Sequence, residues 1–191
     1  MNSQHIKALP RERMIQEVRT VLKHMVKDGP TGDAFVEALA SITQGNVDVL
    51  TDVLPMAERI IGYPIEGTIE SDEAARVMIQ EETFKIIAAR LIQDMEANTL
   101  PTGREEAFTG EWKQYMKTLG KDLGLKGKGL FHPVRLAITG EMSGPDVGCQ
   151  VQLAGLAAEG AVTDVYAPSV SSLADRFAKL KHIMSSSSVI T

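Results

Sequence analysis

Apolar residues recur at three- and four-residue steps along most of this chain, and this spacing restricts what it can fold into. The first stripe contains Met14, Ile15, Val18, Val21, Leu22, Met25 and Val26. Further stripes lie at about 33–45, 52–62, 80–97, 112–119 and 171–182. Such steps place side chains on one face of an α-helix. The sequence therefore predicts an all-α fold, with a weak alternation at 162–166 as the one candidate for a short strand.

Glycine and proline residues give the predicted helix ends. We expect Gly29 and Pro30 to end the first helix, because a glycine followed by a proline is typical of a helix C-terminus. Pro133 and Pro145 are expected to open two short helices, at about 133–139 and 145–158. Proline suits the first helical position because its fixed φ is helical and its missing N–H is not needed there.

The division of the chain is predicted from a polar stretch near its middle. Residues 98–106 include Pro101 and Gly103 and are typical of a linker or exposed loop. We therefore expect a first helical subdomain at 1–100 and a second at 101–184, each a helix bundle or cage. The serine-rich residues 185–191 are expected to form a disordered tail.

Composition excludes several classes of protein. The chain has 191 residues and a single cysteine, Cys149, and its four histidines are far apart in sequence, so we expect no metal site and no internal disulfide. No apolar run approaches the roughly 20 residues that span a bilayer, and the start of the chain lacks a signal-peptide pattern. We expect a protein that is neither secreted nor bound to a membrane.

The net charge of −5 conceals a basic segment. Residues 1–100 hold 10 Lys and Arg against 16 Asp and Glu. Within 112–136 a single acid, Asp122, stands against six cations, which are Lys113, Lys117, Lys121, Lys126, Lys128 and Arg135. Phosphates respond to the local charge, since the Debye length is about 8–10 Å. This segment is therefore the candidate surface for a polyanion.

Arg135 is the first candidate within that segment. Its planar fork of donors suits a base edge or a phosphate; the alternative is a surface arginine paired with Glu141 or Asp146. Lys126 and Lys128 are expected to attract phosphates, or else to be solvated lysines on a glycine-rich loop. Trp112 and Phe131 could each stack on a base, although we expect both in the core. His132 is a further candidate for a contact with RNA.

The turn at Gly144 and Pro145 is the second candidate. The N–H groups at a helix start lack partners within the helix, so they are available to a base carbonyl or a phosphate oxygen. The alternative is a plain helix cap, which is the commoner meaning of a Gly-Pro turn.

Residues 124–145 resemble the C-terminal anticodon-binding region of bacterial and organellar glutamyl-tRNA synthetases. That family has a pattern close to G-x-K-G-K-x-L-F-x-P-L-R-x-A-L-T-G-x-x-x-G-P, and here Val134 and Ile138 replace two of its leucines. The stretch 2–10, Trp112 and residues 62–64 also resemble the family. The resemblance implies a class I synthetase anticodon-binding architecture. It also implies that Arg135 contacts the anticodon, and that Gly144, Pro145 and Val147 surround an anticodon base.

The same resemblance implies the function. The chain lacks the HIGH-type and KMSKS-type motifs of class I synthetases, so we expect no catalytic residue in it, and ATP and Mg²⁺ would belong to a separate catalytic half. The expected function is tRNA binding, with tRNA-Glu as partner, in the glutamyl-tRNA aminoacylation of translation. The expected compartment is a bacterial cytoplasm or an organelle.

A second hypothesis remains open at this point. A synthetase-like chain without a catalytic half could serve as a catalytically inactive interaction subunit that binds a protein partner. The acidic first 100 residues would suit that role.

Overall fold

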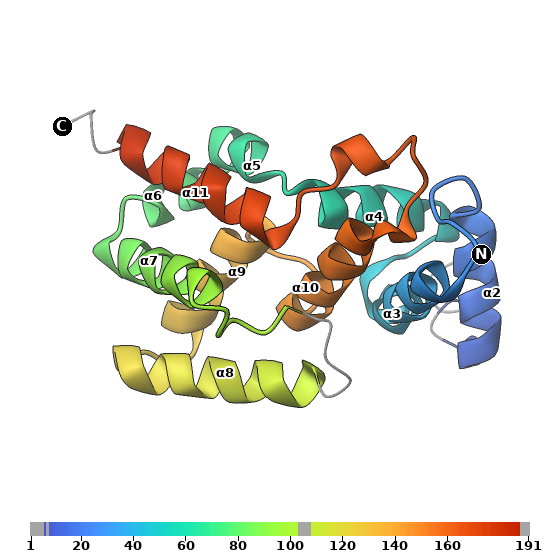
Figure 1. Ribbon diagram of the computed structural model, residues 1–191, viewed down its shortest axis with the longest axis horizontal. Coiled ribbons are helices and arrows are strands. Elements are labelled where there is room, and N and C mark those ends of the chain that lie inside the picture. The colour runs from blue at the N-terminus through green and yellow to red at the C-terminus, as the bar shows by residue number, and fades with distance from the viewer. Residues whose placement is uncertain (1–5, 7, 103–107, 188–191) are drawn as a thin grey trace. The chain divides into compact units, whose positions relative to one another are not determined.

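The computed structural model describes residue 6, residues 8–102 and residues 108–187. Helices account for nearly all of the regular structure in these residues, so the predicted all-α fold is confirmed (Figure 1). The one extended pairing among them is an isolated antiparallel bridge between Val26 and Val162, which lies within the candidate strand at 162–166. Every helix in this part of the chain is too short or too polar to cross a lipid bilayer.

The chain divides into two compact units, and each is discontinuous in sequence. The first contains the described residues of 1–62 and 144–172, and the second those of 63–143 and 173–191. The units therefore differ from the expected ranges 1–100 and 101–184. The difference arises because two segments return to pack on helices that precede them in sequence, and a local pattern of glycine and proline carries no signal for such long-range packing.

Among the described residues of the first unit, four helices surround one core. They are α2 (Arg11–Val21), α3 (Pro30–Asn46), α4 (Val53–Gly62), which follows the 3-10 turn η1 (Leu50–Asp52), and α10 (Val147–Leu156). Helix α10 packs against α3 and α4, and α2 packs against α3. The π-helical turn η2 (Ala157–Ala161) and the 3-10 turn η3 (Ala167–Ser169) follow α10. The core consists of buried aliphatic side chains with Phe35 at 0% exposure.

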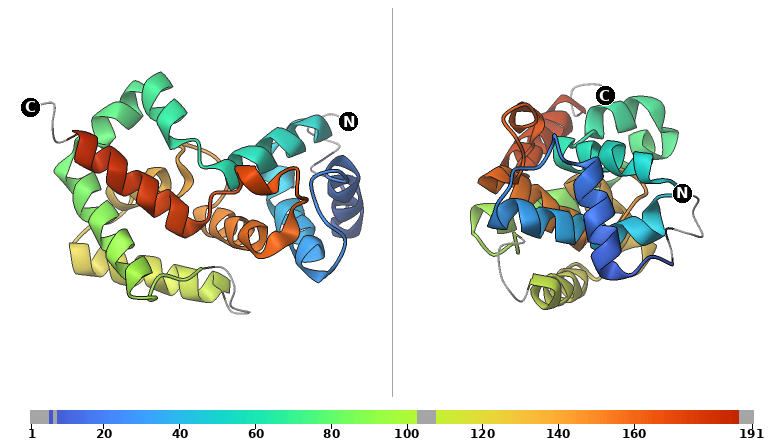
Figure 2. Two further views of the ribbon diagram at one scale, coloured as in Figure 1. Left: turned by 45° about the horizontal axis from the view of Figure 1, so that its top comes forward. Right: turned by 90° about the vertical axis from the view of Figure 1, so that its right-hand side faces the viewer.

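The second unit contains the six remaining helices of the described chain. They are α5 (Ile65–Ser71), α6 (Glu73–Met78), α7 (Glu82–Glu96), α8 (Phe108–Leu123), α9 (Lys128–Thr139) and α11 (Leu173–Ser187). Helix α9 packs against α7, and α11 lies beside both of them (Figure 2). Helix α9 is therefore held by a helix that precedes it in sequence and by one that follows it.

Gly29 and Pro30 begin α3 and do not end the first helix, so that prediction was wrong. Helix α2 ends at Val21, and residues 22–25 form a hydrogen-bonded turn. Gly29 takes a φ of 122° before α3, and Pro30 occupies its first turn. A glycine-proline pair suits either end of a helix, and here the position of Pro30 at a helix start accounts for the structure.

The predicted starts of the two later helices were also wrong. Helix α9 begins at Lys128, so Pro133 lies inside it. This position is tolerated because the carbonyl group that loses its partner belongs to the exposed Gly129, where water can reach it. Helix α10 begins at Val147 after the cap residue Asp146, and Pro145 precedes that cap.

The serine-rich end of the chain is helical as far as the structure describes it. Residues 185–187 belong to α11, and the hydroxyls of Ser185 and Ser186 donate hydrogen bonds to the carbonyls of Lys181 and His182. The expectation of a disordered tail is wrong for these three residues. Residues 188–191, like residues 103–107 of the expected linker, lie outside the described chain.

Gly140 offers a test of how closely α9 approaches α5. Its φ is +73°, and a Cβ added there would lie 2.8 Å from the backbone nitrogen of Ile65. We predict that Gly140→Ala lowers the free energy of unfolding by about 2 kcal/mol or more, because the left-handed conformation and the clash both cost energy. Urea denaturation followed by circular dichroism measures the change.

Gly124→Ala is the matched control. Gly124 also has a positive φ, of 66°, but nothing lies within 4 Å of an added Cβ. The Gly124→Ala variant should lose only the part of the unfolding free energy that comes from the left-handed conformation, about 1 kcal/mol. Equal losses in the two variants would contradict a close approach at Gly140.

Candidate nucleic-acid interface

The lysines of the basic segment lie on the surface of the second unit. Lys113, Lys117 and Lys121 are exposed and follow one another at four-residue steps along α8, so they share one face of that helix. Lys126 lies in the loop after α8, and Lys128 is the first residue of α9; both are exposed. None of these five side chains forms an ion pair with another described residue. Their charges are therefore available to an anion.

Arg135 lies one helical turn after Phe131 on α9 and is partly exposed, although its Nη1 atom is buried. Lys128, Phe131 and Arg135 follow at steps of three and four, so they share one face of the helix. The opposite side of α9 is buried and contains Pro133, Leu136 and Ala137. The helix therefore presents two cations and one aromatic ring on the side that its core residues leave free.

The two aromatic residues that the sequence placed in the core differ in position. Trp112 is 7% exposed, and its ring lies 6.1 Å from that of Phe108 and 5.9 Å from that of Tyr115. Phe131, in contrast, is 54% exposed. The core expectation was right for Trp112 and wrong for Phe131, because α9 begins five residues earlier than Pro133 suggested and Phe131 lies on the exposed side of its first turn.

Two residues far apart in sequence hold the end of α9. The last carbonyl groups of a helix have no partners within it. Here the hydroxyl of Tyr63 donates to the carbonyl of Ala137 at 2.8 Å, and Nη1 of Arg176 donates to that of Ile138 at 3.1 Å. Gly140 closes the helix by donating its N–H to the carbonyl of Leu136 at 3.0 Å. The direction of α9 is thus fixed from its buried end.

Arg176 is a fully buried cation at that end. Its exposure is 0%, and its guanidinium lies 5.3 Å from the centre of the Tyr63 ring, which is 1% exposed. Burial lowers the pKa of Arg176 to about 10 and raises the pKa of Tyr63. Arg176 is therefore still charged at neutral pH, and a positive charge is favourable at the C-terminal end of a helix dipole.

Arg176 was not among the residues predicted from the sequence, although a signal was present. Leu173, Phe177 and Leu180 form the apolar stripe of α11, and Arg176 falls within the same stripe at the i+3 position. A lone arginine among core positions is expected to find a buried acceptor, because burying an unpaired charge is costly.

The turn at 144–147 belongs to the first unit, whereas Arg135 belongs to the second. Gly144 has a φ of 133°, which glycine adopts readily, and Pro145 is buried. The buried side chain of Gln150 donates to the carbonyl of Pro145 at 3.0 Å and so anchors the turn from within α10. Val147 is partly exposed at the first position of that helix.

Asp146 changes what this turn can bind. Its carboxylate accepts a hydrogen bond from the N–H of Cys149 at 3.0 Å, so one of the helix N–H groups expected to be available is occupied. The carboxylate also places a negative charge at the helix start, which repels a phosphate. The turn therefore suits the donor and acceptor edge of a base better than it suits a phosphate oxygen.

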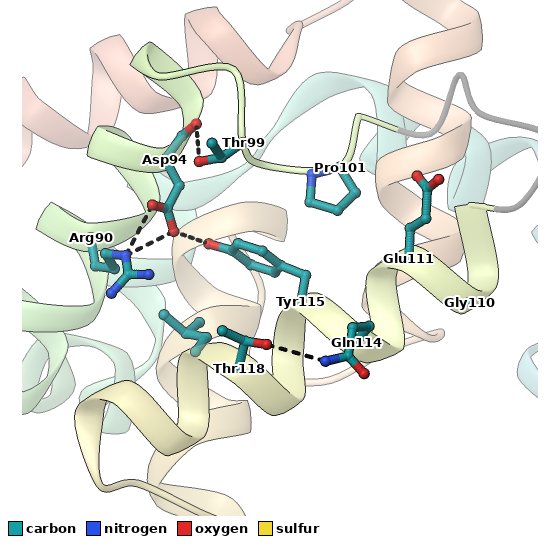
Figure 3. A pocket seen from close by; sticks show the side chains of 10 residues that line it. Arg90, Asp94, Thr99, Pro101, Gly110, Glu111, Gln114, Tyr115 and Thr118 are labelled. Atoms are coloured by element: carbon teal, nitrogen blue, oxygen red, sulfur yellow. Dashed lines mark hydrogen bonds and ion pairs between the residues drawn. The ribbon is translucent and has the colours of Figure 1, made fainter.

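A cavity of about 680 Å³ lies between α7, the turn after it and α8 (Figure 3). Asp94 accepts hydrogen bonds from Nε of Arg90 at 2.9 and 3.0 Å and from the hydroxyl of Tyr115 at 2.7 Å. Nη2 of Arg90 also donates to Asp122 at 3.1 Å. Hydrogen bonds to these two carboxylates raise the pKa of Arg90, and burial raises the pKa of Tyr115.

The charges around this cavity do not favour RNA. Arg90 is engaged by two carboxylates, and Glu111 adds a third at the wall. A phosphate would therefore meet net negative charge. Neither at this cavity nor elsewhere in the described residues is a group of three His, Cys, Asp or Glu side chains arranged to hold a metal ion. The exposed face of α9 and the lysines before it remain the candidate interface.

The Tyr63 hydroxyl gives a prediction about the buried end of α9. Tyr63→Phe removes the donor to Ala137 and leaves a buried carbonyl without a partner, so we expect a loss of about 1–3 kcal/mol in the free energy of unfolding. Tyr166→Phe is the control, because the Tyr166 hydroxyl has no hydrogen bond to any described residue. Thermal and urea unfolding of both variants measure the difference. Equal stability of the two variants would show that the bond to Ala137 contributes nothing.

Comparison with known families gives one match that covers most of the chain. Residues 13–157 match the family model described as "Anticodon binding domain". Among curated proteins, the glutamate–tRNA ligase of Listeria innocua is 26% identical over 163 residues, which is 82% of this chain and 31% of the relative. The glutamate–tRNA ligase of Geobacillus stearothermophilus is 29% identical over 164 residues, which is 81% of this chain and 30% of the relative.

A solved structure has a similar fold. The crystal structure of a glutamate tRNA ligase from Elizabethkingia meningosepticum, in complex with its amino acid, superposes with a TM-score of 0.62 at 16% identity. The match covers 96% of this chain and 31% of that one. The chain thus spans about a third of the length of the relatives it matches.

Proposed function

Since the chain belongs to the anticodon-binding domain family, we propose that it binds tRNA through α9 and the turn at 144–147 without catalysing a reaction itself. One observation carries this proposal. No Asp or Glu occurs between Asp122 and Glu141, and within that stretch Lys126 and Lys128 are exposed while Arg135 is partly exposed. A surface of this kind attracts phosphates and offers a planar donor group to a base.

The proposed mechanism separates attraction from recognition. The lysines of α8 and of the following loop approach the phosphates of the anticodon arm, which gives affinity but no choice of sequence. Arg135 and the turn at Gly144, Pro145 and Val147 contact bases that are splayed out of the loop. Unpaired bases are the usual targets of sequence-specific RNA recognition, because their edges are not occupied by a complementary strand.

We further propose that the tRNA is tRNA-Glu. The relatives are glutamate–tRNA ligases, and in such a protein this region would select the tRNA while a catalytic half, with ATP and Mg²⁺, attaches glutamate. The chain itself contains no HIGH-type or KMSKS-type motif. The corresponding compartment is a bacterial cytoplasm or an organelle.

The alternative is an interaction subunit that keeps the fold and binds a protein instead of RNA. The excess of acids in residues 1–100 favours it, since that part of the chain would repel RNA. The two functions differ in one respect that is simple to measure, namely whether the chain prefers tRNA-Glu over other tRNAs at physiological salt.

Arg135→Ala provides the test of base contact. We predict that it weakens binding of tRNA-Glu by about 10- to 100-fold and reduces the preference over a tRNA with another anticodon, because one base contact is worth about 1–3 kcal/mol. The double variant Lys126→Ala, Lys128→Ala should weaken the binding of all tRNAs alike. It should also reduce the magnitude of the slope of log K, the association constant, against log salt concentration by about 1–2. Filter binding at several salt concentrations measures both.

Arg13→Ala is the control, because Arg13 is an exposed arginine on α2 that pairs with Glu17 at 2.5 Å and lies outside the proposed interface. It should bind tRNA-Glu as the unmodified chain does. If the unmodified chain shows no preference for tRNA-Glu, the interaction-subunit alternative is favoured. If Arg135→Ala behaves as Arg13→Ala does, the proposed role of Arg135 is wrong.

A further inference from the structure

We propose that Phe131 is a base-stacking residue, whose ring packs against an unpaired base of the bound RNA. This inference deepens the proposed function and rests on it. It assigns to α9 an aromatic contact that acts next to the charged contact of Arg135.

Phe131 is far more exposed than the other phenylalanines of the chain. The chain has five phenylalanines, and the other four are between 0% and 4% exposed. Four further large hydrophobic side chains are exposed in the described chain, and all are aliphatic: Val49, Val77, Ile86 and Val165. A phenylalanine ring left partly in water forgoes some of the favourable free energy of apolar burial. A ligand that covers the ring would recover that free energy.

The position of the ring on α9 fits a nucleotide. Along the helix axis Lys128 lies about 4.5 Å before Phe131 and Arg135 about 6 Å after it, from the rise of about 1.5 Å per residue. A base stacked on the ring would have a cation on either side. Its phosphate could then approach Lys128 while its edge approaches the guanidinium of Arg135.

The surroundings of Phe131 favour a base over an apolar protein partner. The exposed residues that precede and follow it are Lys126, Gly127, Lys128, Gly129 and His132. No second large hydrophobic side chain on α9 or on the loop before it is exposed among the described residues. A protein docking surface normally needs a contiguous apolar patch, whereas stacking needs one ring and an attractive charge nearby.

The backbone under the ring is fixed before any ligand binds. Gly127 takes a φ of 57° before α9, and its carbonyl accepts hydrogen bonds from the N–H groups of Leu130 at 3.1 Å and Phe131 at 3.0 Å. Pro133 and Leu130 are buried on the other side of the helix. Binding therefore has to order only the ring torsions, which keeps the entropic cost of stacking small.

The test compares aromatic with aliphatic replacements in the 191-residue chain. The probe is the anticodon stem-loop RNA of tRNA-Glu with the fluorescent base 2-aminopurine in the loop, and its fluorescence falls when the base stacks. We expect Phe131→Ala and Phe131→Leu to weaken binding about tenfold and to abolish the fall in fluorescence, while Phe131→Trp retains both. Ile86→Ala, which removes an exposed aliphatic side chain from α7, is the control and should bind as the unmodified chain does.

The possible failures are distinct. If Phe131→Leu binds as well as the unmodified chain, the contact is apolar without stacking and the inference is overturned. The inference is also overturned if Phe131→Ala binds normally while Arg135→Ala is impaired, and in that case the proposed function stands. If the unmodified chain does not bind the stem-loop, both the inference and the proposed function fail. Since Phe131 is exposed, circular dichroism should show all three variants folded.

Discussion

The carbonyl groups at the end of α9 point into the core of the second unit, where each needs a donor other than water. Tyr63 and Arg176 supply two of these donors from segments more than 35 residues away in either direction. A buried acceptor without a partner costs about 1–3 kcal/mol, so the two bonds strongly favour a single position for the helix end. The buried charge of Arg176 is also favourable there, since it meets the negative end of the helix dipole. Gly140 completes the arrangement by allowing the backbone of Ile65 to approach closely.

This constraint divides α9 into two parts with different tasks. The C-terminal part is buried and fixed, whereas the first turn exposes Lys128 and Phe131 to solvent. Arg135 lies between the two, with one guanidinium nitrogen buried. A side chain held in this way loses little freedom when it contacts a base, so its hydrogen bonds can discriminate between bases instead of offsetting an entropic cost. In the proposed function the lysines of α8 and the loop would need no such support, since attraction to phosphates does not depend on exact geometry.

The sequence predicted the elements that depend on local patterns. The all-α fold follows from the three- and four-residue periodicity, and the family was recognised from the motif around Arg135; both are confirmed. The start of α9 was missed because a proline signals a helix start only when no earlier residue can cap the helix, and Gly127 does so here. The wrong prediction that Phe131 is buried followed from that error. The discontinuous units and the bonds of Tyr63 and Arg176 depend on contacts between distant segments, for which one sequence gives little signal; the arginine in the apolar stripe of α11 was the exception. The roles of Lys126, Lys128, Arg135, Gly144, Pro145 and Val147 stay predictions.

Cross-linking is the most direct measurement of whether the exposed face of α9 and the turn at 144–147 contact the anticodon. A tRNA-Glu stem-loop that carries the photoreactive base 4-thiouridine in its anticodon would be irradiated with the chain, and mass spectrometry would locate the attached peptides. We predict attachment within residues 126–147, centred on the exposed face of α9 and the turn at Gly144. Attachment confined to other segments, at RNA concentrations that saturate binding, would contradict it.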